Sequence, residues 1–182
     1  MLQIMYKRRS VRQYTAEPVT PEQTRQILAA ALLAPTGHNK KPCRFIAVND
    51  RELLDKLAAA KEYGADFLRQ APLAVVVTAD GSLSDIWMED AAIAAAYMQL
   101  AAEALGLNSC WSQIWRRPRR GEGEGTQWAE DYLREMFALA PQVHVLAIVA
   151  VGHGARVGRA RKEDDLPWEN VSYNLQSSGG AE

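Results

Sequence analysis

Arg8-Arg9-Ser10-Val11-Arg12, near the beginning of the chain, is the stretch around which the rest of this sequence can be interpreted. It places three guanidinium groups and a hydroxyl within five residues, just before the polar turn Thr15-Ala16-Glu17-Pro18. A guanidinium is always charged, and its fork of N–H donors matches the oxygens of a phosphate. If the stretch is extended, Arg8, Ser10 and Arg12 project from one face, because side chains alternate along a strand. Either that face binds an anion, or the stretch is solvated surface charge.

The composition is that of an ordinary globular protein. With 182 residues, 48% hydrophobic and 24% charged, the chain is expected to form one domain, residues 1–182, with a substantial core. The net charge of −1 argues against nucleic acid as the main partner. No apolar run has the length of a membrane span, and the first residues lack the apolar core of a signal peptide. The two cysteines, Cys43 and Cys110, form no disulfide framework or metal-site pattern, so we predict a cytoplasmic protein without a metal.

Patterns typical of helices and of strands are mixed along the chain. Thr20-Pro21-Glu22-Gln23 indicates a helix start with a capping box, and Pro35 ends that helix. Residues 71–79 are continuously apolar, which predicts a strand buried on both faces. Residues 85–105 predict an alanine-rich helix that is apolar nearly all round and ends at Gly106. Such a helix fits a domain core and a subunit interface equally well.

Other parts of the chain are predicted more coarsely. Strands are expected at residues 45–48, 109–114 and 143–151, and helices capped by Asn49 or Asp50 and by Thr126. The basic, glycine-rich residues 116–125 predict an exposed loop, with binding of a dianionic substrate as the alternative. Residues 164–182 are polar and predict a C-terminal arm that frays at its end.

The segment from Pro35 to Phe45 predicts a structured loop that leads into a strand. Two prolines stiffen it, Gly37 allows close backbone approach, and Thr36 and Asn39 offer hydrogen bonds. This loop either connects two elements and does no more, or it contacts a ligand, as loops on a rigid scaffold often do.

Several classes of site are missing. The three histidines share no spacing with carboxylates or thiols, so neither a Ser-His-Asp triad nor a metal site can be assembled. There is also no GxGxxG after a strand and no Walker A lysine loop, which excludes the usual nucleotide-binding signatures.

Taken in order, the motifs resemble those of the FMN-dependent nitroreductase family. Arg8 to Arg12 with Glu17-Pro18-Val19 resembles its N-terminal motif. Ala34 to Phe45 is similar to its second motif, usually Pro-Ser-x-x-Asn-x-Gln-Pro-Trp. Asp90 to Trp111 resembles the third, and Val151-Gly152-His153-Gly154 with the basic stretch after it fits the C-terminal region.

The resemblance extends from about Arg8 to Tyr173, and four motifs in the right order are specific. Two residues depart from the family pattern. Lys41 replaces the usual glutamine and Cys43 the usual tryptophan, both beside the loop that contacts the flavin in that family.

The resemblance implies an α+β, nitroreductase-like fold with a mixed, mainly antiparallel sheet flanked by helices. It also implies an intertwined homodimer with two FMN sites at the interface, each built from both chains. The implied cofactor-binding residues are Arg8, Arg9, Ser10, Arg12, Pro35, Thr36, Gly37, Asn39, Trp111, Ser112, Gln113, Arg159 and Arg161.

Each group has an implied role. Arg8, Arg9 and Ser10 would hold the FMN phosphate and ribityl chain, because a phosphate dianion needs several fixed cations and donors. Arg159 and Arg161 would add positive charge there.

The remaining implied residues surround the flavin ring. Arg12 would support it electrostatically at the N1–C2 edge, since the reduced flavin is negative there. Pro35 to Asn39 would come from the partner chain, and Trp111 to Gln113 would line the ring. No side chain is expected to act as the catalytic group, because the flavin performs the chemistry.

The function implied is an oxidoreductase that passes electrons from NADH or NADPH to a nitroaromatic, quinone or similar small-molecule acceptor by a ping-pong mechanism. One alternative is a reductase of the same fold that acts on an enone or a halogenated aromatic. Another is a flavin-binding module without turnover. Flavin absorbance of the purified protein, and its bleaching by a nicotinamide donor, would discriminate between these hypotheses.

Overall fold

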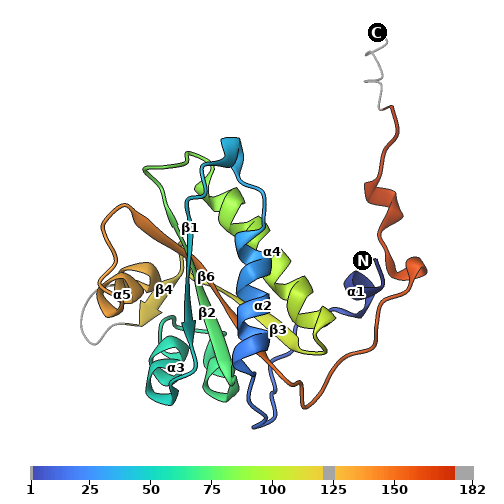
Figure 1. The fold of residues 1–182 in the computed structure, drawn as a ribbon, viewed down its shortest axis with the longest axis horizontal. Coiled ribbons are helices and arrows are strands. Elements are labelled where there is room, and N and C mark those ends of the chain that lie inside the picture. Colours follow the sequence, from blue (N-terminus) through green and yellow to red (C-terminus); the bar gives the residue numbers. More distant parts are fainter. Residues whose placement is uncertain (1, 121–125, 175–182) are drawn as a thin grey trace.

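The computed structural model describes residues 2–120 and 126–174 and is built around a four-stranded antiparallel sheet (Figure 1). The strand order in the sheet is β1-β2-β6-β3. These strands are β1 (Cys43–Val48), β2 (Leu73–Asp80), β3 (Asn108–Gln113) and β6 (Val143–Gly152). A separate hairpin pairs β4 (Pro118–Arg120) with β5 (Thr126–Trp128). The helices are α1 (Leu2–Lys7), α2 (Pro21–Leu32), α3 (Arg51–Ala58), α4 (Trp87–Ala104) and α5 (Ala129–Met136).

The two central strands, β2 and β6, divide the core into two layers. Val75 and Val149 are opposite each other and face α2 and α4, whereas Val76 and Ile148 face α3 and α5. All four of these side chains are fully buried. The continuous apolar runs therefore form strands covered on both faces, which confirms the prediction for residues 71–79 and 143–151.

Local sequence signals explain the helix boundaries. Thr20 accepts a hydrogen bond from the Gln23 amide, and the Gln23 side chain accepts one from the Thr20 amide, so the predicted capping box is present. Gly106 follows α4 with a φ of +75°, the left-handed conformation that glycine adopts without strain.

Helix α4 is apolar nearly all round, as predicted, but only one side of it is covered in this chain. It packs against α1, α2 and the sheet, and Ala94, Ala95 and Met98 are fully buried. Its opposite side exposes Ile93 and Tyr97, which are 38% and 42% exposed. An apolar helix surface left open to water is typical of a protein–protein interface.

The structure differs from the sequence prediction around residues 116–126. Residues 118–120, expected to lie in a loop, form β4, and Thr126, expected to cap a helix, lies in β5. Helix α5 begins three positions later, at Ala129. Part of the predicted loop, residues 121–125, lies outside the described residues.

The predicted C-terminal arm extends away from the sheet, beyond α1 (Figure 1). Residues 164–174 of the arm include a short 3₁₀ helix, Trp168–Asn170. The side chains of Trp168 and Tyr173 are exposed. Residues 175–182 of the arm lie outside the described residues. None of the helices described is long and apolar enough to traverse a bilayer.

Candidate functional site

A pocket of about 510 Å³, here called the β3 pocket, lies beside β3, which is one of the two edge strands of the sheet. Trp111 and Gln113 of β3 contribute to its wall, and their side chains are joined by a hydrogen bond of 2.9 Å from Trp111 Nε1 to Gln113 Oε1. The charged residues that line it are Arg12, Lys61, Glu62 and Arg117.

The stretch from Arg8 to Arg12 runs alongside β3. Ser10 forms a parallel bridge with Ser109, and the Val11 amide donates a hydrogen bond of 3.1 Å to the Ser109 carbonyl. Val11 is 2% exposed, so its side chain fixes the stretch against the core, and the next residue, Arg12, lines the β3 pocket.

The β3 pocket is electropositive. Within residues 2–120 and 126–174, none of Arg12, Lys61 and Arg117 forms an ion pair, and Glu62 forms none either. Burial lowers the pKa of Lys61, and the charges of Arg117 and Arg12 lower it further. Three cations held near one another without partners create a potential that favours an anion.

The C-terminal basic residues Arg159 and Arg161 belong to a segment that passes close to the Arg8–Arg12 stretch. The Arg161 amide donates to the Tyr6 carbonyl at 2.8 Å, and a Cβ at Gly158 would lie 3.7 Å from Arg9 Nε. Arg159, however, forms two hydrogen bonds of 2.6 and 2.8 Å with the Asp165 carboxylate. The Arg159 guanidinium is therefore already paired. Its hydrogen bonds to Asp165 lower the pKa of that carboxyl group.

Ser112 does not share the surface of its neighbours in β3. Its side chain is buried on the opposite face from Trp111 and Gln113, because side chains alternate along a strand. Its hydroxyl has no hydrogen-bond partner among the described residues. Only the backbone of Ser112 is therefore available to the β3 pocket.

The loop from Pro35 to Asn39 lies at the N-terminal end of α4 and does not line the β3 pocket of its own chain. The Gly37 amide donates to Asp90 Oδ1 at 2.8 Å, and Ser84 Oγ donates to Asp90 Oδ2 at 2.9 Å. Asp90 is 1% exposed, so its carboxylate ties the loop to α4 from inside the protein. A Cβ at position 37 would contact the end of the Ile86 side chain, so Ile86 would have to move if another residue replaced Gly37.

Replacing Asp90 with alanine is expected to destabilise the protein by about 1–3 kcal/mol, because the partly buried Gly37 amide and the buried Ser84 hydroxyl lose their acceptor. Urea unfolding measures this change. Asp85→Ala is the matched control, since Asp85 is 88% exposed and its pairing with Lys40 Nζ at 3.5 Å contributes little. Equal unfolding midpoints for the two variants would contradict this role of Asp90.

Sequence reasoning missed Lys61 and Asp90, and it included Arg117 only within residues 116–125, for which anion binding was the alternative to an exposed loop. Asp90 carries a signal in hindsight, since it precedes the alanine-rich part of α4, and a carboxylate buried there needs a hydrogen-bond partner. Lys61 carries none, because only the fold brings it to Arg12 and Arg117. Three or more potential metal ligands do not come together anywhere in the described ranges.

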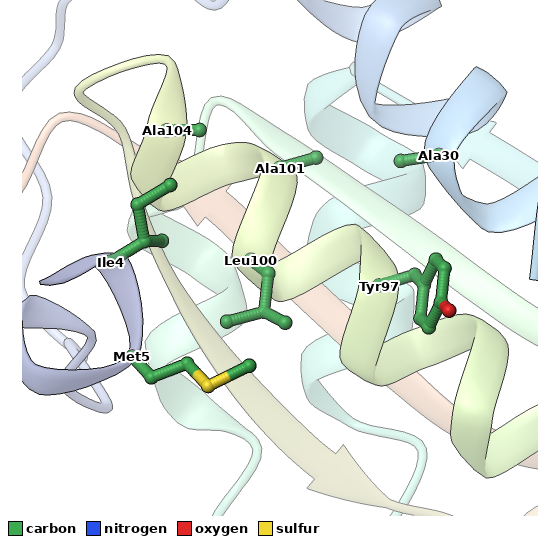
Figure 2. A pocket seen from close by; sticks show the side chains of 7 residues that line it. All are labelled: Ile4, Met5, Ala30, Tyr97, Leu100, Ala101 and Ala104. Carbon is green, nitrogen blue, oxygen red and sulfur yellow. The ribbon is translucent and has the colours of Figure 1, made fainter. Parts of the chain in front are cut away.

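A second hollow, of about 440 Å³, lies over the open side of α4 (Figure 2). Ile4 and Met5 of α1 border it on one side, and Tyr97 and Leu100 of α4 on another. The lining is almost entirely apolar, so this α4 groove is suited to another apolar surface and not to a charged ligand.

The residues around the β3 pocket fit the FMN that the sequence resemblance implies. Arg8 and Arg9 provide cations beside Ser10, Arg12 provides one within the pocket, and Trp111 offers an aromatic surface. The edge strand β3 adds backbone groups that β6 does not pair. These residues thus include cations suited to a phosphate, an aromatic surface suited to a planar ring, and polar groups suited to a ring edge.

Comparisons with known proteins identify the family and the fold. A sequence model of the Nitroreductase family matches residues 5–62 and 56–153. A protein of Archaeoglobus fulgidus, provisionally named NADH dehydrogenase/NAD(P)H nitroreductase, is 35% identical over 156 residues, 84% of each chain. The structure of an FMN-dependent nitroreductase from Clostridium difficile R20291 is 37% identical, with a TM-score of 0.90 over 97% of this chain and 100% of that one. A provisionally named nitroreductase of Desulfovibrio desulfuricans, solved in complex with FMN, is 29% identical, with a TM-score of 0.76 over 97% of each chain.

Proposed function

The chain belongs to the nitroreductase family, and from this premise we infer that it is an FMN-dependent oxidoreductase that uses NAD(P)H. The observation that carries this inference is the β3 pocket, where Arg12 lies beside the wall made by Trp111 and Gln113. FMN, when bound, takes a hydride from the nicotinamide and returns two electrons to an acceptor.

The protein's own part is binding and electrostatics. We assign Arg8, Arg9 and Ser10 to the FMN phosphate and ribityl chain, with Arg161 nearby, since its backbone is bonded to α1. Arg12 supplies positive charge where the ring becomes negative. Glu62 is the one carboxylate among the described lining residues, and no histidine is among them, so solvent is the proposed source of protons.

We further propose that the active form is a homodimer. The α4 groove and the exposed Ile93 and Tyr97 provide an apolar surface that a second copy can cover. The Pro35–Asn39 loop lies away from the β3 pocket of its own chain, which supports the proposal that it completes the partner's site.

The acceptor is proposed to be a nitroaromatic or a quinone, and it is proposed to use the same pocket as the donor. The sequence has no separate nicotinamide-binding motif, so the two molecules would bind in turn in the β3 pocket. Because the oxidised donor must leave before the acceptor can bind, we expect a ping-pong order.

The purified protein is expected to be yellow, with FMN equimolar to the chain, and to bleach under anaerobic NADH or NADPH. Recovery of the colour on adding nitroaromatics, quinones, enones and halogenated aromatics would rank the acceptor classes. Parallel double-reciprocal plots are expected for the preferred pair. Bound flavin that no donor bleaches would instead identify a binding module, and intersecting plots would refute the shared pocket.

A further inference from the structure

The β3 pocket holds more positive charge than one flavin-supporting arginine. Lys61 and Arg117 line it together with Arg12, and Glu62 is the only described lining residue of opposite charge. Lys61 lies between α3 and the short turn Asp66–Gln70, and Arg117 lies between β3 and β4. Neither belongs to the Arg8–Arg12 stretch that we assign to FMN.

Backbone hydrogen bonds fix the segments that carry these two cations. The Arg117 amide donates to the Ile114 carbonyl at 3.0 Å, and the Arg117 carbonyl accepts from the Ala129 amide at 2.9 Å. The Glu62 amide, next to Lys61, donates to the Pro118 carbonyl at 3.2 Å. The segments that carry Lys61 and Arg117 are therefore tied to each other, and their mutual repulsion is built into the fold.

No ion pair among the described residues relieves that repulsion. Neither cation forms an ion pair within the described ranges, and the pKa of Lys61 is lowered by burial and then by Arg117 and Arg12. An anion that enters the pocket between them would remove the repulsion and gain two charge-assisted contacts.

We propose that Lys61 and Arg117 form a subsite for an anionic substituent on the molecule that shares the pocket with FMN. The substituent is either a carboxylate on an aromatic acceptor or the 2′-phosphate that distinguishes NADPH from NADH. This proposal deepens the proposed function and rests on it, because it names what selects the second reactant.

Equilibrium binding to the oxidised, FMN-loaded protein tests the proposal without turnover. Isothermal calorimetry compares 4-nitrobenzoate with 4-nitrobenzamide, which has the same shape but no charge, and NADP⁺ with NAD⁺. In at least one pair the more anionic ligand is expected to bind about tenfold more tightly, the worth of one charge-assisted contact. That preference should decrease as salt is added, since partly exposed charges are screened.

Lys61→Met and Arg117→Gln should each reduce the preference several-fold while changing the Kd of the neutral or less charged ligand by less than about twofold. The ligand pair for which the preference is lost shows whether the subsite binds an aromatic carboxylate or the 2′-phosphate of NADPH. Arg116→Gln is the matched control, because Arg116 is exposed, lies 5.8 Å from the Trp115 ring centroid and does not line the pocket.

Three outcomes would overturn the proposal: no preference in either ligand pair, a preference that survives both substitutions, or an equal loss in Arg116→Gln. FMN affinity is measured separately in each variant. If a variant binds FMN more weakly but, once saturated with FMN, keeps the ligand preference, the charge that it lacks contacts the cofactor and not the second reactant. Protein that never binds FMN would refute the proposed function, whereas calorimetry on that same protein would still report on the Lys61–Arg117 subsite.

Discussion

Replacing Tyr97 with glutamate is expected to convert the protein into a monomer and to weaken FMN binding by about 100-fold or more. Tyr97 borders the α4 groove, and a carboxylate there would be buried without a partner if a second copy covered it. The separated chain would also lose the partner's Pro35–Asn39 loop from its flavin site. Light scattering at micromolar concentration measures the mass, and absorbance after dialysis measures the retained flavin.

Trp128→Glu is the control for Tyr97→Glu. Trp128 is 49% exposed, comparable with the 42% of Tyr97, and it lies beside α5 on the other face of the sheet. The same change from aromatic to charged at that position should leave a yellow dimer. A wild-type monomer with bound flavin, or a Tyr97→Glu dimer that retains it, would contradict the proposed assembly.

The parts of the fold that were predictable are those determined by neighbours in sequence. The capping box at Thr20 and Gln23 requires only four residues, and Gly106 ends α4 through its own φ angle. The continuous apolar runs of β2 and β6 identify central strands without any knowledge of what covers them. Helix α1 was not predicted, because six residues with no buried side chain carry little local signal.

The candidate site was only partly predictable, because it combines residues that are far apart in the chain. The adjacency of Arg9 and Gly158 follows from where residues 158–161, ahead of the arm, pass α1, which no local pattern encodes. Lys61 and Arg117 reach the β3 pocket through the hydrogen bond between Glu62 and Pro118.

The opposite orientation of Ser112 was predictable in principle. Three consecutive strand residues cannot all face one ring, and applying the period of two to Trp111 to Gln113 would have separated the middle residue from its neighbours. The family resemblance gave the segment, whereas the strand geometry decides which side chains in it reach the pocket.

Replacing Arg12 with alanine is expected to make bound FMN harder to reduce. Arg12 lines the β3 pocket without an ion pair in the described residues, so its charge is available to the negative charge that FMN gains on reduction. Removing a cation that favours the reduced form shifts the midpoint potential to more negative values. A contact worth about 0.7 kcal/mol, within the usual range for an exposed guanidinium, corresponds to about 15 mV for two electrons.

Spectroelectrochemical titration of the FMN-saturated protein measures this shift, and stopped-flow bleaching by NADH should slow in parallel. Arg12→Lys retains the charge and should shift the potential less than Arg12→Ala. Arg116→Ala removes the same charge from an exposed position outside the pocket and should leave the potential unchanged. Because FMN is saturating, weaker binding cannot produce the shift, so an unchanged potential in Arg12→Ala would remove the electrostatic role assigned to this arginine.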